Sequence, residues 1–220
     1  MNSPLKKLTL WCLLAATTQL TQAADQPLKI QNGERIVLIG SGLGSRMNHF
    51  GHFETELQLR NPQSKLFIRN ICDEGNTPGF RPQPGRKSPW AFPGAEKFQT
   101  ELAKGSGSTG HFETPDEWIT RLKADTIIAF FGFNSSFAGE QGIANYKAEL
   151  AAFIKHTLAQ KYNGKAAPQL AIVSPTAFQD LSDKYGSPDG AATNTNLALY
   201  TKAMKEVCTE QEVLFIDVYS

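Results

Sequence analysis

Three features are scarce in this 220-residue sequence: cysteine, excess charge of either sign, and long apolar runs. The 22 basic residues nearly balance the 21 acidic ones, which leaves a formal net charge of +1. No Lys/Arg stripe is present that could release counterions from a phosphate backbone, so we expect no nucleic-acid partner. No apolar run reaches the roughly 20 residues that a membrane-spanning helix needs, so we expect no stable membrane anchor either.

The first residues have the pattern of a secretory signal peptide. Lys6 and Lys7 precede an apolar run from Leu8 to Ala16, and Thr21-Gln22-Ala23 then offers small residues at the positions that a signal peptidase reads. We predict cleavage after Ala23, which makes the mature protein an exported one, either periplasmic or secreted. A hydrophobic share of 40% and this chain length suit a single core, so residues 24–220 are expected to form one domain.

Export changes the interpretation of the cysteines, because an oxidising compartment permits disulfides. Cys12 belongs to the expected signal peptide, so only Cys72 and Cys208 remain in the mature chain. A bridge between them and two separately buried thiols are both compatible with their positions, one after a strand and one in a late helix. Neither cysteine has the spaced partners of a zinc site.

Short runs rich in Val, Ile, Leu and Phe recur along the chain, each followed by a loop and a helix-like stretch. Runs that do not alternate between polar and apolar residues are typical of parallel strands buried on both faces. The order predicts a doubly wound, flavodoxin-like α/β fold with a five-stranded parallel sheet in a three-layer αβα arrangement. The strands are expected at 35–39, 65–69, 125–131, 169–173 and 213–216, and the helices at 47–59, 115–122, 143–160 and 194–208.

One segment interrupts this alternation. Residues 73–114 are rich in Gly, Pro, Ser and Thr, and their main apolar anchors are Trp90, Phe92, Phe98 and Phe112. A loop of this length inside a compact domain is usually functional or disordered, and the aromatic residues favour an ordered insertion. Trp90 and Phe92 have two interpretations, as a sugar-stacking surface or as packing anchors of the loop.

Sites of doubly wound sheets lie where loops leave the carboxyl ends of the strands. Three such loops contain Gly40-Ser41-Gly42-Leu43, Gly75-Asn76-Thr77 and Gly132-Phe133-Asn134. In composition and order these blocks resemble those of the SGNH (GDSL-like) hydrolase family, most closely at the third block. The resemblance implies an esterase or acylhydrolase that needs no cofactor and acts on a small-molecule or carbohydrate ester.

The same resemblance assigns the oxyanion hole. It makes the Asn134 amide one donor and the backbone N–H of Gly75 another, both aimed at the charge that develops on oxygen during acyl transfer. The competing interpretations are that Asn134 caps the turn after its strand and that Gly75 is a turn residue that requires a positive φ.

The first block departs from the family at the nucleophile. Gly42 lies where the family has its serine, and glycine has no group that attacks a carbonyl. Ser41 and Ser45 are the two weak candidates for the nucleophile, and both could instead cap the helix that follows. The glycines at 40, 42 and 44 also allow the backbone to approach an anion at the start of that helix. The alternative to an enzyme is an inactive ligand- or glycan-binding protein of the same fold.

The general base is missing as well. The family pattern has Asp-x-x-His after the fifth strand, whereas Asp217 ends that strand and no His follows it as far as Ser220. We therefore expect the chain to be part of a longer reading frame and to be inactive by itself. His49 and His52 share a helix face and could serve as a base or simply face solvent, and we predict no metal site. His156 is expected to face outward.

Overall fold

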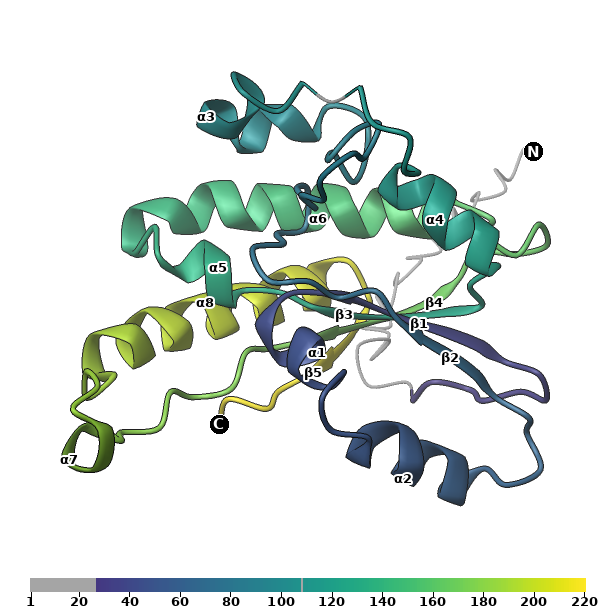
Figure 1. Cartoon of the computed structure of the whole chain (residues 1–220), viewed down its shortest axis with the longest axis horizontal. Helices are drawn as coiled ribbons and strands as arrows, with labels where there is room; N and C mark the ends of the chain where they lie inside the picture. Colours follow the sequence, from purple (N-terminus) through teal and green to yellow (C-terminus); the bar gives the residue numbers. More distant parts are fainter. Residues whose placement is uncertain (1–26, 108) are drawn as a thin grey trace, which may run out of the picture.

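The computed structural model describes residues 27–107 and 109–220 of the chain, so the expected signal peptide at 1–23 lies outside the described residues (Figure 1). Five parallel strands form one sheet in the order β2-β1-β3-β4-β5, which confirms the doubly wound five-stranded prediction. In chain order the strands are β1 Arg35–Gly40, β2 Phe67–Asn70, β3 Thr126–Phe130, β4 Gln169–Val173 and β5 Leu214–Ile216.

Helices connect these strands and cover both faces of the sheet (Figure 1). Among the described residues, no helix is long and apolar enough to span a membrane. The α-helices are α1 Gly42–Arg46, α2 His52–Arg60, α3 Thr100–Ala103, α4 Pro115–Leu122, α5 Phe133–Ser136, α6 Ile143–Ala159, α7 Ser182–Tyr185 and α8 Ala191–Glu210, and the 3-10 helices are η2 Ala95–Phe98 and η3 Glu140–Gly142.

The three layers follow from the period of two along each strand. In β3, Ile127 and Ala129 belong to the core beneath α4, α6 and α8, whereas Ile128 and Phe130 belong to a second core beneath α1 and α2. Successive side chains of a strand point to opposite faces, so every residue of β3 is buried. A strand buried on both faces reads as an unbroken apolar run, which is why the sequence located this strand to within a residue at each end.

The two cysteines lie on these opposite faces. Cys72 packs in the core beneath α1 and α2, and Cys208 packs in the core beneath α4, α6 and α8. Both are buried free thiols, so of the two alternatives the structure has separate thiols and no bridge. Burial raises the pKa of Cys72 well above its usual range and that of Cys208 to about 12.

The single helix expected over 47–59 is wrong. The chain has the short helix α1, then a turn from 47 to 51, and then α2, which begins after Gly51. Phe50 is 60% exposed in that turn and therefore contributes no packing that would extend a helix through a glycine.

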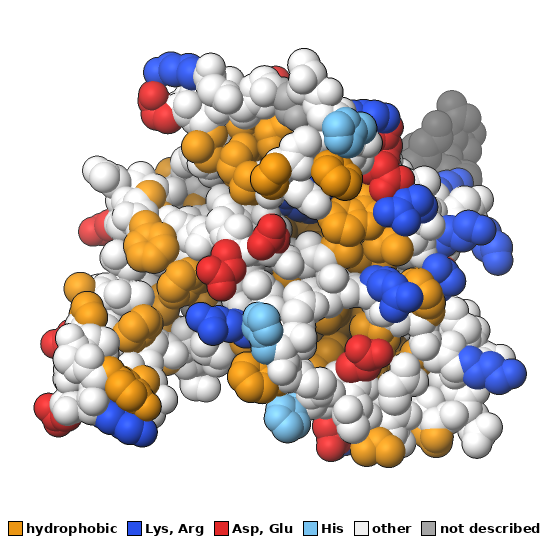
Figure 2. All heavy atoms as spheres, in the orientation of Figure 1, with side chains coloured by type: hydrophobic (Ala, Val, Ile, Leu, Met, Phe, Trp, Pro, Cys, Tyr) orange, Lys and Arg blue, Asp and Glu red, His pale blue; other side chains and the backbone are white. Residues whose placement is uncertain are grey.

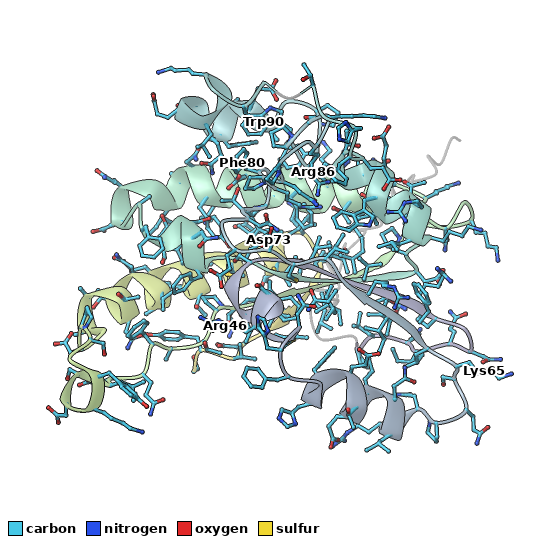
Figure 3. All side chains as sticks on the ribbon, viewed as in Figure 1. Arg46, Lys65, Asp73, Phe80, Arg86 and Trp90 are labelled. Atoms are coloured by element: carbon cyan, nitrogen blue, oxygen red, sulfur yellow. The ribbon has the colours of Figure 1, made fainter. Side chains whose placement is uncertain are left out.

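The insertion at 73–114 has its own ordered structure. Phe80 and Trp90 form an isolated antiparallel bridge, and their rings lie 5.2 Å apart. Figure 3 shows both side chains within the part of the insertion that lies over α6. Phe92 is only 6% exposed and joins the core beneath α4 and α6, which favours its interpretation as a packing anchor. Figure 2 shows further hydrophobic side chains gathered on the visible face below α3 and beside α4.

The side chain of Glu149 on α6 fastens this insertion to the rest of the domain. Its Oε1 accepts hydrogen bonds from Thr77 Oγ1 at 2.8 Å, from the Gly79 N–H at 3.0 Å and from Gln99 Nε2 at 3.3 Å. Glu149 is 1% exposed, and this burial raises its pKa, although the three donors oppose the shift. A buried carboxylate of α6 thus organises the start of the insertion.

The prediction that His156 faces outward is also wrong. Its Nε2 lies 2.6 Å from Asp116 Oδ2, and its ring centroid lies 5.8 Å from that of Phe92. Asp116 belongs to the first turn of α4, which is fixed by a capping box between Thr114 and Glu117. The contact joins two helices that are 40 residues apart in sequence, so helical spacing within α6 could not reveal it.

Candidate active site

A pocket of about 380 Å³ opens at the carboxyl ends of β1, β3 and β4. It lies at the point where the strand order changes direction, between β1 and β3, which is where doubly wound sheets bind their ligands. The wall is mainly apolar with a few polar groups, and its residues are Ser41, Gly42, Leu43, Arg46, Glu74, Phe130, Phe131, Phe133, Asn134, Ser174, Pro175, Thr176, Ala177 and Phe178. This composition suits a small, mostly apolar ligand group.

Asn134 lies in α5, at the end of β3, and forms part of this wall. The preceding Gly132 has a φ of 101°, and a Cβ at this residue would lie 2.9 Å from Met204 Sδ, so the turn that presents Asn134 requires glycine. Asn134 Nδ2 donates a hydrogen bond to the backbone oxygen of Asn76 at 3.1 Å. Because an amide carries two N–H donors, this bond orients the group and leaves the second N–H for a ligand.

Asn76 is a site residue that the sequence did not single out. Its side chain is 4% exposed, and its Nδ2 donates to the Gly40 oxygen at the end of β1 at 2.8 Å. Since its backbone oxygen accepts from Asn134, Asn76 joins the first and third loops. In the sequence, only its position directly after a turn glycine marks Asn76 as a candidate site residue. The burial of an asparagine in a loop cannot be predicted from sequence.

Gly75 has a φ of +85°, as its interpretation as a turn glycine requires. It is exposed, and its N–H donates no hydrogen bond to any residue that the structure describes. Glu74, its neighbour, forms part of the pocket wall, whereas Gly75 does not. Of the two predicted oxyanion donors, the structure therefore places only Asn134 in the pocket wall.

Of the two candidate serines, the structure places only Ser41 at the pocket. Its N–H donates to the Phe130 oxygen at 2.7 Å, and its Oγ lies 3.4 Å from the same oxygen. Ser41 is 2% exposed and makes no side-chain capping bond, so it does not cap α1 through its hydroxyl. Ser45 is half-buried within α1 and lies outside the pocket wall.

The empty nucleophile position is not imposed by packing. A Cβ built on Gly42 would meet no heavy atom within 4 Å, so a serine side chain has room there. Gly44 differs, because its Cβ would lie 2.3 Å from the Cys72 sulfur and 2.8 Å from the Phe130 ring. The fold thus requires glycine at 44 and accepts a side chain at 42.

Charged groups at the pocket are few. Arg46 and Glu74 form an ion pair with a 3.9 Å separation between Nε and Oε1, and both side chains are largely exposed, so the pair contributes little stability. Figure 3 shows Arg46 beside α1, at this side of the sheet. Within the described ranges no histidine lines the pocket. His49 and His52, the two histidines considered as a base, are exposed near the start of α2.

Asp217, which follows β5, does not belong to the pocket. Asp217 accepts hydrogen bonds from the N–H groups of Tyr219 and Ser220 at 2.9 and 3.1 Å and lies outside the pocket wall. In the part of the chain that the structure covers, no cluster of three or more His, Cys, Asp or Glu side chains could hold a metal ion.

Comparison with solved structures identifies similar folds among hydrolases. A catalytic mutant of Axe2, an acetylxylan esterase from Geobacillus stearothermophilus, has a TM-score of 0.52 at 13% identity, covering 87% of this chain and 79% of the other. An alpha/beta hydrolase enzyme from the metagenome of Lake Arreo, Spain, has a TM-score of 0.52 at 14% identity, with 86% and 78% covered.

A third similar structure is a gut microbial diltiazem-metabolizing enzyme, with a TM-score of 0.56 at 11% identity. It is matched over 89% of this chain and 38% of its own. No protein-family model matches the sequence, and no curated protein matches it significantly. At these identities the comparisons establish the fold that the chain shares with these enzymes, and no more.

Proposed function

We propose that this chain is an SGNH-type hydrolase domain whose pocket binds the acyl part of an ester of a carbohydrate or another exported small molecule. Ser41 is the attacking hydroxyl in this proposal, and the amide of Asn134 and the N–H of Gly75 stabilise the oxyanion. The observation that carries it is the position of Asn134, whose amide is fixed by Asn76 in the wall of a mostly apolar pocket at the switch point of the sheet.

Two physical features support acyl-group binding. Apolar side chains of Leu43, Phe133 and Phe178 contribute to the wall, and apolar surface favours removal of an acyl chain from water. An oriented amide N–H also discriminates for an oxygen that gains negative charge, because the donor is preorganised before the reaction begins. The esterases with similar folds agree with this chemistry.

Ligand binding without turnover is the second candidate function. Gly42 favours it, because the residue at the family's nucleophile position has no side chain. The described residues also place no imidazole within reach of the Ser41 hydroxyl, which therefore lacks a base that would take its proton. For this reason we expect the 220-residue chain alone to show no turnover.

The two functions are separated by one set of measurements on a short-chain nitrophenyl ester. The protein, together with any residues that its gene encodes after Ser220, is assayed beside its Ser41→Ala and Ser45→Ala variants, and labelling by a fluorophosphonate probe is recorded. Turnover and labelling that are lost in Ser41→Ala and kept in Ser45→Ala support the hydrolase. Absence of both in the full product, together with retained binding of an acetylated oligosaccharide, supports the binding protein.

Export is part of the proposal. The pattern of residues 1–23 supports it, and expression with that segment in a bacterium tests it. Mature protein that begins at residue 24 in the periplasmic or extracellular fraction is the expected result. Retention of the uncleaved chain in the cytoplasm contradicts it.

A further inference from the structure

A second, smaller pocket of about 150 Å³ lies on the other side of the loop that carries Gly75, between the end of β2 and the insertion. Its volume equals that of about five water molecules at liquid density, roughly 30 Å³ each. Two members of its wall, Arg81 and Arg86, are buried cations. The lining residues are Asn70, Ile71, Cys72, Asp73, Asn76, Arg81, Pro82, Gln83, Arg86, Pro115 and Trp118.

We propose that this pocket binds a small oxyanion, a phosphate, sulfate or carboxylate group, between the guanidinium groups of Arg81 and Arg86. Neither the esterase nor the binding function proposed above requires such a site. Figure 3 shows Arg86 in the insertion above Asp73, which follows β2, so the pocket lies where the insertion meets the edge of the sheet.

Arg81 supplies the strongest argument for an anion. The residue is 6% exposed, and its Nε and Nη1 find no hydrogen-bond partner among the described residues. Its guanidinium carbon lies 5.4 Å from the centre of the Phe153 ring, which holds the group without accepting an N–H bond. Burial lowers the pKa of Arg81 to about 10, so it remains charged at neutral pH. The charge of Asp116 lies close enough to oppose this pKa shift, but Asp116 accepts no hydrogen bond from Arg81 Nε or Nη1. Buried donors without acceptors are costly, and an anion in the pocket would accept from both.

Arg86 is held in place and still has a donor to spare. Its Nη1 donates to the Glu113 oxygen at 2.9 Å, its Nη2 donates to Gln83 Oε1, and its guanidinium carbon lies 5.3 Å from the Trp118 ring centre. Its Nε is buried and finds no partner in residues 27–107 or 109–220. The side chain is therefore oriented before a ligand arrives, which reduces the entropy lost on binding.

The charge of the wall favours an anion as well. Arg81 and Arg86 are opposed by Asp73 as the acidic residue of the lining, and Cys72 is neutral because burial raises its pKa. The wall therefore carries one net positive charge. The buried Oδ1 of Asn76 also finds no partner in the described structure, so an anion that carries a hydroxyl, such as hydrogen phosphate or glycolate, can satisfy donors and acceptor together.

The test uses thermal unfolding of the full chain with inorganic phosphate, sulfate, acetate or glycolate, each compared with sodium chloride at equal ionic strength. The variants are Arg81→Met and Arg86→Met. Arg60→Gln is the matched control, because it removes one cation from an exposed position on α2. Replacement of buried ionic groups by apolar side chains of similar size is often neutral or stabilising, and Arg81 Nε and Nη1 make no hydrogen bond that would be lost, so Arg81→Met is expected to fold.

At least one of these anions is expected to raise the Tm of wild type and of Arg60→Gln beyond the chloride value. Its affinity is expected to fall by roughly ten- to a hundredfold in each Met variant, since hydrogen bonds to a charged group are strong. No anion-specific rise in wild type would mean that water satisfies the donors, and this overturns the proposal. An equal rise in wild type and Arg86→Met overturns it too, whether or not Arg81→Met folds. Binding of nitrophenyl ester at the larger pocket serves as the control for retained structure.

Discussion

Removal of the Glu149 side chain is expected to loosen the insertion that borders the candidate active site. In Glu149→Ala, Thr77 Oγ1 and the Gly79 N–H lose their acceptor while they remain buried. Each bond to a carboxylate contributes about 1.5–3 kcal/mol, which gives roughly 3–6 kcal/mol for the two. Gln99 can turn toward water and is not counted. The substitution also removes the free-energy cost of burying the carboxylate, which offsets part of the lost hydrogen bonding. We therefore expect a net destabilisation of about 3 kcal/mol.

The measurement is urea and thermal unfolding of wild type, Glu149→Ala and Glu149→Gln. A cost of about 3 kcal/mol corresponds to a fall in Tm of roughly 6–12 °C for a domain of this size. Glu149→Gln keeps an acceptor oxygen and is expected to lose about 1 kcal/mol. If Glu149→Ala unfolds within about 0.5 kcal/mol of wild type, the hydrogen bonds seen at this carboxylate do not hold the insertion, and the reasoning fails.

The raised pKa of Glu149 gives a second readout. Because burial raises this pKa above its unfolded value, the native state binds the proton more tightly than the unfolded state does. The stabilising contribution is complete below the unfolded pKa and is lost as pH rises through the native pKa. The stability of wild type relative to Glu149→Gln should therefore decrease as pH rises through this window. A difference that increases with pH would show that the hydrogen bonds outweigh burial and lower the pKa instead.

Three further predictions concern the pocket and the cores. Asn134→Ala should lower kcat for ester hydrolysis by the full gene product about 10²–10³-fold with little change in Tm; unchanged turnover removes Asn134 from the oxyanion hole. Gly42→Ser should leave the Tm nearly unchanged. Gly44→Ser should lower the free energy of unfolding by about 1–3 kcal/mol, because its Cβ would lie 2.3 Å from the Cys72 sulfur. Equal Tm values for the two variants would contradict this packing. In protein that begins at residue 24, Cys72 and Cys208 should both react with a thiol reagent only after denaturation, and a count of zero thiols in the denatured protein would reveal a disulfide.

The sheet was the part of the fold most open to prediction. Strands buried on both faces have unbroken apolar sequences, so β4 was located without error and β3 was placed one residue too long at each end. The same physics explains the failure at α1 and α2. Helical spacing of apolar residues around Phe50 predicted one helix, but Phe50 is exposed, and spacing alone does not reveal whether a face is covered.

Residues brought together by long-range contacts were beyond prediction. The contact of His156 with Asp116 joins α6 to α4, and the role of Glu149 depends on donors that are 50 to 72 residues away in sequence. Gly and Pro in residues 73–114 set no period that could locate these contacts. Asn134, by contrast, was found through its Gly132-Phe133-Asn134 block, which resembles a family pattern and lies within four residues of the end of a buried strand.

Asn76 connects the candidate active site to the insertion at residues 73–114. Its side chain is tied to the end of β1, and its backbone oxygen holds the Asn134 amide. The next residue, Thr77, is tied to Glu149 of α6. The Oδ1 of Asn76 meanwhile belongs to the second pocket, so an anion there contacts the residue that orients the oxyanion donor. Loss of Glu149 should consequently weaken ester binding and anion binding together, whereas Arg81→Met should weaken only the anion. A Glu149→Ala protein that lost its insertion contacts yet kept both affinities would show that the two β-strand ends alone position Asn76.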